Sequence, residues 1–286
     1  MLNIKHILFP VDFSERCCSA APFVESMARR YGARITLLGV AQPFYYAAMA
    51  EGPVVIDTEE MLEDLKARLD GSLTKEFAGL RVDRAAELGD PAQAIVDFAH
   101  AQDVNLIMMP THGYGPFRSL LLGSVTAKVL HDAECPVWTA AHVAERLPRE
   151  HLVCRKILCA VDGTPKSVSL IKWAGELGKD AGATLQLVHV ISGMEGLPSR
   201  QMDREFEADM RKEAYRAIER LEETAGVKAE ICVAAGDVAG NIREVALQQG
   251  ADLVVIGRGA LHETLGRLRT HAYGIIRRSP CPVLSV

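Results

Sequence analysis

Three glycines and a closing serine lie in one short stretch, PTHGYGPFRSLLLGS, which covers residues 110–124. Gly113, Gly115 and Gly123 let the backbone approach a ligand closely and turn its N–H groups inward. Ser124 stands near the start of an expected helix, where its hydroxyl and the helix amides favour phosphate oxygens. Taken singly, each residue is explained by a chain turn or a helix cap. Together they predict a site for a phosphate-bearing ligand, provided that the fold brings them to one place.

The chain repeats itself, and the repeat sets the framework around that stretch. KHILFPVDFS returns as RKILCAVDGT and places Asp12 opposite Asp162, 150 residues later. ARITLLGV returns as ATLQLVHV and places Val40 opposite Val190 at the same offset. GDPAQAIVDFAHAQDVNLIMM returns as GDVAGNIREVALQQGADLVVI, and CPVW returns as CPVL. Four matches in one order indicate a duplication. The expected domains are residues 1–141 and 153–286, joined by a polar linker at 142–152.

Strand and helix patterns alternate within each half. Ser14 and Asp90 have side chains that cap helix starts, and wholly apolar strands joined by helices indicate a parallel sheet covered on both faces. The fold class predicted is α/β, with two doubly wound, five-stranded parallel-sheet domains of Rossmann-like type. In the first half we expect strands near 4–9, 34–40, 81–87, 105–109 and 136–139, and helices after Ser14, over 58–75, after Asp90 and over 119–133.

Such sheets bind ligands beyond the carboxyl ends of the strands, where the winding direction reverses. Asp12 directly follows the first strand, Val40 ends the second, and the glycine-bearing stretch follows the fourth. All three features therefore converge on one edge of the sheet, and they predict a site for a ligand of nucleotide size.

These motifs resemble those of the universal stress proteins, specifically the tandem type with two adenine nucleotide alpha hydrolase-like domains. The resemblance covers nearly the whole chain and rests on PVDFS, AVDGT, GD before the third helices, THGYGPFRSLLLGSVTAKVL and CPV. It implies an ATP-binding stress-response or sensor protein, with Mg²⁺ accompanying the phosphates. It also implies a pseudo-twofold pair of domains within the chain, joined through their last strands, to which a homodimer of chains could be added. The ATP contacts that it implies in the first half are Asp12, Val40, Gly113, Gly123 and Ser124.

The first half departs from the family's pattern at one position. The pattern is G-x-x-G, nine residues, then G-[S/T], and Tyr114–Leu122 supplies the nine residues between Gly113 and Gly123. Pro110 takes the place of the first glycine, and it has no backbone N–H to donate. A ligand contact through the Pro110 carbonyl stays open.

The second half departs further, although Asp162 and Val190 are retained. One alignment matches Gly257 to the first glycine, and a shift by one residue matches Gly259 to the second. In either alignment Thr270 falls in the final pair, which becomes Arg-Thr or Thr-His. We therefore expect the better ATP site in the first half, and a degenerate or differently specialised site in the second. Side chains that could bind an anion there, or equally form salt bridges with the other half, are Arg258, Arg267, Arg269 and His271.

No catalytic residue is expected. A hydrolase needs a base or a water-orienting group beside the phosphates, and His112 is the sole candidate for that role. A lone loop histidine more often makes only a hydrogen bond. No Walker-type lysine motif, nucleophile elbow or metal-ligand cluster occurs in the sequence. Slow ATP hydrolysis is therefore the most that is expected, and the alternatives to an ATP sensor are a weak ATPase and an interaction scaffold without nucleotide.

Composition narrows the partners and the compartment. The formal net charge of −5 gives no general attraction to nucleic acid or to anionic lipid, and no apolar run is long enough for a membrane span. Polar residues interrupt the first ten residues, which favours a strand over a signal peptide. An odd number of cysteines without CxxC pairs indicates reduced thiols in a cytoplasmic protein. The seven are Cys17, Cys18, Cys135, Cys154, Cys159, Cys232 and Cys281.

Overall fold

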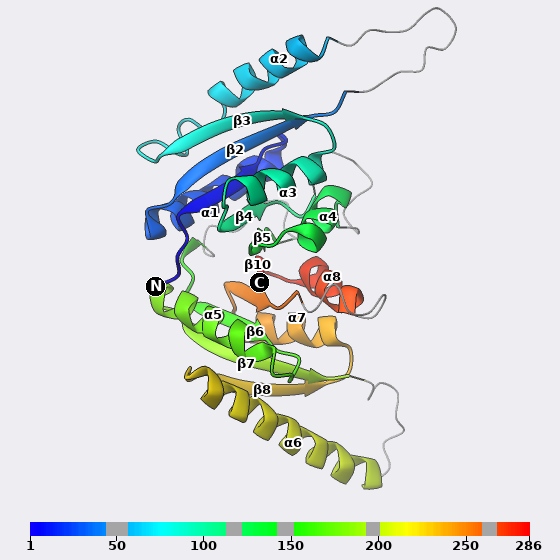
Figure 1. Cartoon of the computed structure of the whole chain (residues 1–286). Helices are drawn as coiled ribbons and strands as arrows, with labels where there is room; N and C mark the ends of the chain where they lie inside the picture. The colour runs from blue at the N-terminus through cyan, green and yellow to red at the C-terminus, as the bar shows by residue number, and fades with distance from the viewer. Residues whose placement is uncertain (44–56, 113–121, 142–151, 193–200, 259–267) are drawn as a thin grey trace, which may run out of the picture. The chain divides into compact units, whose positions relative to one another are not determined.

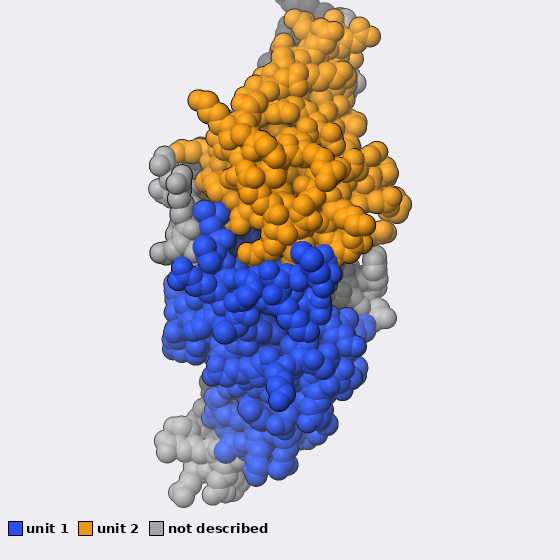
Figure 2. All heavy atoms as spheres, turned by 90° about the vertical axis from the view of Figure 1, so that its left-hand side faces the viewer, with its two compact units in different colours: residues 1–2, 119–122, 138–286 blue, residues 3–118, 123–137 orange. Residues whose placement is uncertain are grey.

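The computed structural model describes residues 1–43, 57–112, 122–141, 152–192, 201–258 and 268–286. These residues fall into two compact units, which Figure 2 colours separately. One unit comprises Asn3–Arg118 and Gly123–Val137, and the other Met1–Leu2, Ser119–Leu122 and Trp138–Val286.

The first half is a parallel sheet with the strand order β3-β2-β1-β4-β5, so the winding direction reverses between β1 and β4. Helices α2 and α3 both pack on β2 and β3, and Figure 1 shows them on opposite faces of that pair. The elements are β1 His6–Pro10, α1 Glu15–Tyr31, β2 Arg34–Ala41, α2 Thr58–Gly71, β3 Val82–Leu88, α3 Pro91–Ala101, β4 Leu106–Met109, α4 Ser124–Asp132 and β5 Val137–Thr139.

The second half repeats this order as β8-β7-β6-β9-β10, again with parallel pairs. Helix α5 packs on α6, and α7 packs on α8. The elements are β6 Lys156–Ala160, α5 Ser167–Ala181, β7 Thr184–Ile191, α6 Gln201–Ala225, β8 Glu230–Ala235, α7 Val238–Gln249, β9 Leu253–Ile256, α8 Leu268–Arg278 and β10 Val283–Ser285. The predicted doubly wound α/β fold is therefore confirmed for both halves. None of the described helices is long and apolar enough to cross a membrane.

The helix starts follow the capping residues read from the sequence. The Ser14 side chain accepts a hydrogen bond from the Cys17 amide, and Asp90 accepts one from Gln93. Pro91 occupies the first turn of α3, where the amide that proline lacks would have no partner in the helix. Each cap satisfies an amide that the helix itself leaves open, so the helix begins at a defined residue.

The centre of each sheet is wholly apolar. Ile7, Leu8 and Phe9 of β1 are fully buried, and the four residues of β4 are buried as well. Because consecutive residues of a strand face opposite sides, burial of every residue means that helices cover both faces. The carboxyl ends of these two strands lie at the edge of the sheet where the sequence predicts the ligand.

His6 lies buried at the opposite, amino-terminal edge of the first half, with 3% of its surface exposed. Its Nδ1 lies 3.0 Å from the Gln102 carbonyl and its Nε2 lies 2.8 Å from the Thr36 hydroxyl. The Arg34 guanidinium lies 3.1 Å from the same Nδ1. Burial lowers the pKa of His6, and the nearby Arg34 guanidinium lowers it too, against the opposing effects of Gln102 and Asp83.

Because of this histidine, we expect the free energy of unfolding of the first half to fall in acid. Because the folded pKa lies below the ordinary value of about 6.5, the unfolded chain takes up the proton first as the pH falls. The stabilisation is complete above about pH 6.5 and is lost as the pH falls towards the folded pKa. In the wild type, the urea midpoint of the first half should therefore drop between about pH 7.5 and about pH 5.5.

The His6→Gln variant should lose that part of the pH dependence. The second half supplies an internal comparison, because Lys156 replaces the histidine and its Nζ donates to the Gln249 carbonyl over 2.8 Å. An equal acid response in wild type and His6→Gln would show that other groups cause it.

Candidate functional site

Asp12 lies at the carboxyl edge of the first sheet, in the turn that follows β1. The Val11 amide donates to the Leu38 carbonyl over 2.8 Å, which ties the turn to β2. The Ser14 amide and hydroxyl donate to Asp12 Oδ1 over 2.9 Å and 2.6 Å. Both of these hydrogen bonds to the half-buried carboxylate end on the same oxygen, Oδ1. The carboxylate is thus held in one orientation while its second oxygen can serve a ligand.

Asp162 occupies the equivalent turn of the second half. Its Oδ1 accepts hydrogen bonds from the Thr164 amide, the Thr164 hydroxyl and the Ser167 hydroxyl, over 2.9, 2.8 and 2.6 Å. Burial alone would raise the pKa of Asp162, but the hydrogen bonds from Ser167 and Thr164 outweigh it, so the pKa is lowered. Both halves therefore present an oriented carboxylate at the same place.

The end of β4 is tied to the start of α4. The Gly123 amide donates to the Thr111 carbonyl over 2.9 Å, and the Thr126 hydroxyl donates to the Pro110 carbonyl over 3.1 Å. A Cβ on Gly123 would lie 3.1 Å from the Thr111 oxygen and 3.2 Å from His112 Cα, closer than side chains normally pack. Glycine at position 123 allows this close approach without any shift of the neighbouring atoms. The Pro110 carbonyl, which the sequence left open for a ligand, is used inside the protein.

Ser124 is exposed and is the first residue of α4, which begins later than the expected range of 119–133. The N-cap residue is Gly123, so no side chain caps the first amides of this helix. Helices α1, α2 and α3 differ, because Ser14, Asp57 and Asp90 cap them. The amides of the first turn of α4 and the Ser124 hydroxyl therefore form a donor group suited to an anion.

His112 is buried, with 3% of its surface exposed, and its Nδ1 lies 3.1 Å from the Thr111 hydroxyl. Thr111 is equally buried. This placement matches a histidine that holds the local structure rather than one that receives a proton from water beside a phosphate.

The valines lie where the sequence placed them. Val40 is half-buried one residue before the end of β2 and pairs with Glu87 of β3. Val190 lies one residue before the end of β7 and pairs with Ala234. Each is at the carboxyl edge of its sheet, on the strand next to the one that leads to the aspartate.

The loops after the fourth strands are described only in part. Gly257 follows β9 and is exposed, and the Arg258 amide donates to the Val286 carbonyl over 3.0 Å. Gly113 and Gly259 lie outside the described residues, as does the side chain of Thr270, whose backbone belongs to α8. Their assignment to the site stays a prediction.

Three residues of this edge escaped the sequence reading. Thr126 holds the Pro110 carbonyl, Phe13 has a positive φ of 63° in the aspartate turn, and His189 lies against the equivalent turn of the second half. A comparison of the repeats carried the signal, because Phe13 stands opposite Gly163 and Gly39 stands opposite His189. The first half has the large side chain in the turn and glycine on the second strand, and the second half has the reverse.

Metal and thiol chemistry find no support in the described part of the chain. No group of three or more His, Cys, Asp or Glu side chains there could hold a metal ion. Cys17, Cys159 and Cys281 are buried thiols that form no disulfide. Burial raises the pKa of Cys159 and of Cys281 to about 12 and raises that of Cys17 as well, so these thiols stay protonated at neutral pH.

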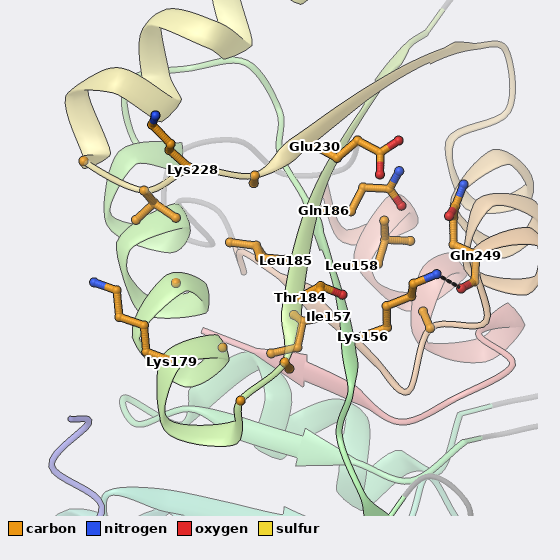
Figure 3. A pocket seen from close by; sticks show the side chains of 18 residues that line it. Lys156, Ile157, Leu158, Lys179, Thr184, Leu185, Gln186, Lys228, Glu230 and Gln249 are labelled. Carbon is orange, nitrogen blue, oxygen red and sulfur yellow. Dashed lines mark hydrogen bonds between the residues drawn. The ribbon is translucent and has the colours of Figure 1, made fainter.

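A hollow of about 790 Å³ lies elsewhere, at the amino ends of β6, β7 and β8 (Figure 3). The carboxyl ends of α5 and α7 border it through Lys179 and Gln249. Helix carboxyl ends carry partial negative charge, which disfavours a phosphate. The Lys156 ammonium in this hollow already donates to the Gln249 carbonyl. The hollow is therefore separate from the carboxyl edge that holds Asp162.

Comparisons with known proteins agree with this architecture. The model of the universal stress protein family matches the chain twice, at residues 3–140 and 154–286. A universal stress protein of Thermus aquaticus is 32% identical over 139 residues, which cover 46% of this chain and 96% of that protein. One of Methanocaldococcus jannaschii is 30% identical over 137 residues, covering 46% and 79%.

Among solved structures, a universal stress protein from Archaeoglobus fulgidus shares the fold over 99% of this chain and 96% of its own. The TM-score is 0.69 and the sequence identity is 21%. Because the two family matches together span most of the residues, the chain belongs to the universal stress protein family, as a tandem of two such repeats.

Proposed function

We propose that the chain is an ATP-binding stress-response or sensor protein whose better nucleotide site is the carboxyl edge of the first half. The observation that carries the proposal is the uncapped amino end of α4, which is tied to the end of β4 beside the strand that leads to Asp12. Oriented helix amides suit phosphate oxygens, and an oriented carboxylate suits the hydroxyl groups of a ribose.

Within this site each residue has a separate task. Val40 would contact the adenine, and Asp12 would accept hydrogen bonds from the nucleoside, as the family resemblance implies. Gly113, Gly123 and Ser124 would face the phosphates, with the first turn of α4 supplying the amides. Pro110 has no N–H to donate, so it could contact the ligand only through its carbonyl, which already accepts one hydrogen bond from Thr126. Mg²⁺ would be held by phosphate oxygens rather than by a protein cage.

The second half keeps the oriented carboxylate and loses the glycine-serine pair. We propose that its site is degenerate or takes a different anion, with Asp162, Val190 and Gly257 retained at the edge. The proposed partners beyond adenine nucleotide are the other half of the same chain, over repeats 1–141 and 153–286, and a second copy of the chain. The buried thiols of Cys17, Cys159 and Cys281, which form no disulfide, support a cytoplasmic location.

Ser124→Ala tests the phosphate contact. The serine is exposed and makes no cap hydrogen bond, so its loss should leave folding unchanged. Calorimetry with ATP and Mg²⁺ should show binding weakened roughly tenfold, the effect of one lost hydrogen bond to a charged group at the lower end of its range. Thr270→Ala, the change at the counterpart position, should leave this affinity unchanged.

Wild-type protein sets the reference for that comparison. Denaturing the purified protein should release adenine nucleotide, which mass spectrometry identifies. Turnover of ATP by the wild type should be absent or slow. No released nucleotide together with no calorimetric heat would favour the interaction scaffold, and rapid turnover lost in a His112→Gln variant would favour the ATPase.

A further inference from the structure

The turn that carries Asp12 has an unfavourable backbone conformation at its next residue. Phe13 has a φ of 63°, in the left-handed region that side chains other than glycine rarely adopt. The conformation matters for the site, because residue 13 links Asp12 to Ser14, whose amide folds back to donate to Asp12 Oδ1. The orientation of the carboxylate therefore depends on the backbone of Phe13.

An arginine from another element contacts this phenylalanine. The Arg68 guanidinium carbon lies over the Phe13 ring, 4.0 Å from its centre, which is the geometry of a cation–π contact. Arg68 belongs to α2, on the helix surface, whereas Phe13 is half-buried in the turn. The contact thus joins the aspartate turn to a helix that starts only at Thr58.

The position of α2 depends in turn on Gly39 of β2. A Cβ on Gly39 would lie 2.8 Å from Leu65 Cδ1 and 3.1 Å from Leu69 Cδ1. Both leucines are buried, with 6% and 1% of their surfaces exposed. The missing side chain lets α2 sit close to β2, and Arg68 lies on the same helix between these anchors.

The second half holds its turn without such an arginine contact among the described residues. Gly163 has a φ of 80° and adopts it without steric cost, and the ring of His189 lies against it, with Cε1 3.3 Å from the position of a Cβ. His189 is fixed by a hydrogen bond between its Nδ1 and the Val161 carbonyl, 3.0 Å long. Among the described residues, the arginine contact from α2 thus occurs in the half that has phenylalanine in the turn.

We infer that Arg68 is a positioning residue for the nucleotide site: it holds Phe13 in its left-handed conformation and so keeps the Asp12 carboxylate oriented for the ligand. The inference rests on the proposed ATP site of the first half. Arg68 itself touches neither the proposed ligand nor Asp12 in this role. Its effect on binding passes through residue 13.

A double-mutant cycle on the full chain tests the inference, with the ATP dissociation constant measured by calorimetry. Arg68→Ala should weaken binding about two- to fivefold, the range of an exposed cation–π contact. In a Phe13→Gly background, where the turn needs no clamp, Arg68→Ala should have no effect. Arg68→Lys, which keeps the charge but not the flat guanidinium, should fall between wild type and alanine.

Lys66→Ala is the matched control, because this lysine is an exposed cation on the same helix. It should bind ATP like the wild type, and thermal melting should show all variants folded. An equal loss from Arg68→Ala in both backgrounds, or no loss in either, would overturn the inference while leaving the ATP site intact. No ATP binding by the wild-type chain would instead overturn the proposed function, and this inference with it.

Discussion

Replacing Asp12 with alanine should weaken ATP binding to the first half roughly ten- to a hundredfold. A hydrogen bond to a charged group contributes about 1.5 to 3 kcal/mol, which corresponds to that range in the dissociation constant. The effect should be large because the Ser14 amide and hydroxyl hold Asp12 Oδ1 in place before any ligand arrives. A preoriented group loses little entropy on binding, so its full interaction is available to the ligand.

Asp162→Ala is the matched control for this change. It removes an equally oriented carboxylate, held by Thr164 and Ser167, from the half that lacks the glycine-serine pair. Calorimetry should find the strong ATP site unaltered in this variant. If Asp162→Ala caused the greater loss, the assignment of the better site to the first half would be wrong. Asp12→Asn should fall between alanine and wild type, because the amide keeps the shape and loses the charge.

Phe9→Ala should destabilise the first half by about 3 to 5 kcal/mol, the usual cost of removing a buried phenylalanine side chain. Phe9 is fully buried in β1, and its ring meets Phe77 edge to face, with centroids 6.3 Å apart and planes at 81°. Alanine would leave a cavity beneath the strand that leads to Asp12. Urea unfolding should show the loss as a lower midpoint of one transition.

The matched control for this change is Cys159→Ala. Cys159 occupies the equivalent position in β6 and is equally buried, but its replacement removes only one heavy atom. Hydrogen exchange read by mass spectrometry separates the halves: Phe9→Ala should speed exchange in β1 and β4 and spare β6 and β9. Uniform acceleration over all four strands would contradict local destabilisation.

The framework was readable from the sequence because its signals are redundant. The wholly apolar run at 106–109 indicated a buried parallel strand, and the capping side chains of Ser14 and Asp90 marked the starts of α1 and α3. Two of these features recur in the second half, where β9 is again apolar and buried and Asp237 caps α7 as Asp90 caps α3. A signal that occurs in both repeats supports the same assignment twice.

The site was readable only in part, since several of its contacts involve residue types with weak local preferences. Phenylalanine is not typical of a left-handed turn, so nothing in the residue type of Phe13 announces its φ of 63°. The hydroxyl of Thr126 reaches the Pro110 carbonyl across the loop, 16 residues back along the chain, and such a pairing leaves no spacing pattern. The loop glycine Gly113 lies outside the described residues, so its phosphate contact stays a prediction.

The hydrogen bond between the Gly123 amide and the Thr111 carbonyl has a consequence for how members of such a duplicated family diverge. It fastens both ends of the intervening segment to the same point of the framework. Closing a longer segment adds little entropic cost once its ends are joined, so this stretch can be exchanged or lengthened while α4 keeps its place. The segment between Thr111 and Gly123 can therefore change in one copy, and ligand preference with it, while the scaffold that both copies share stays the same.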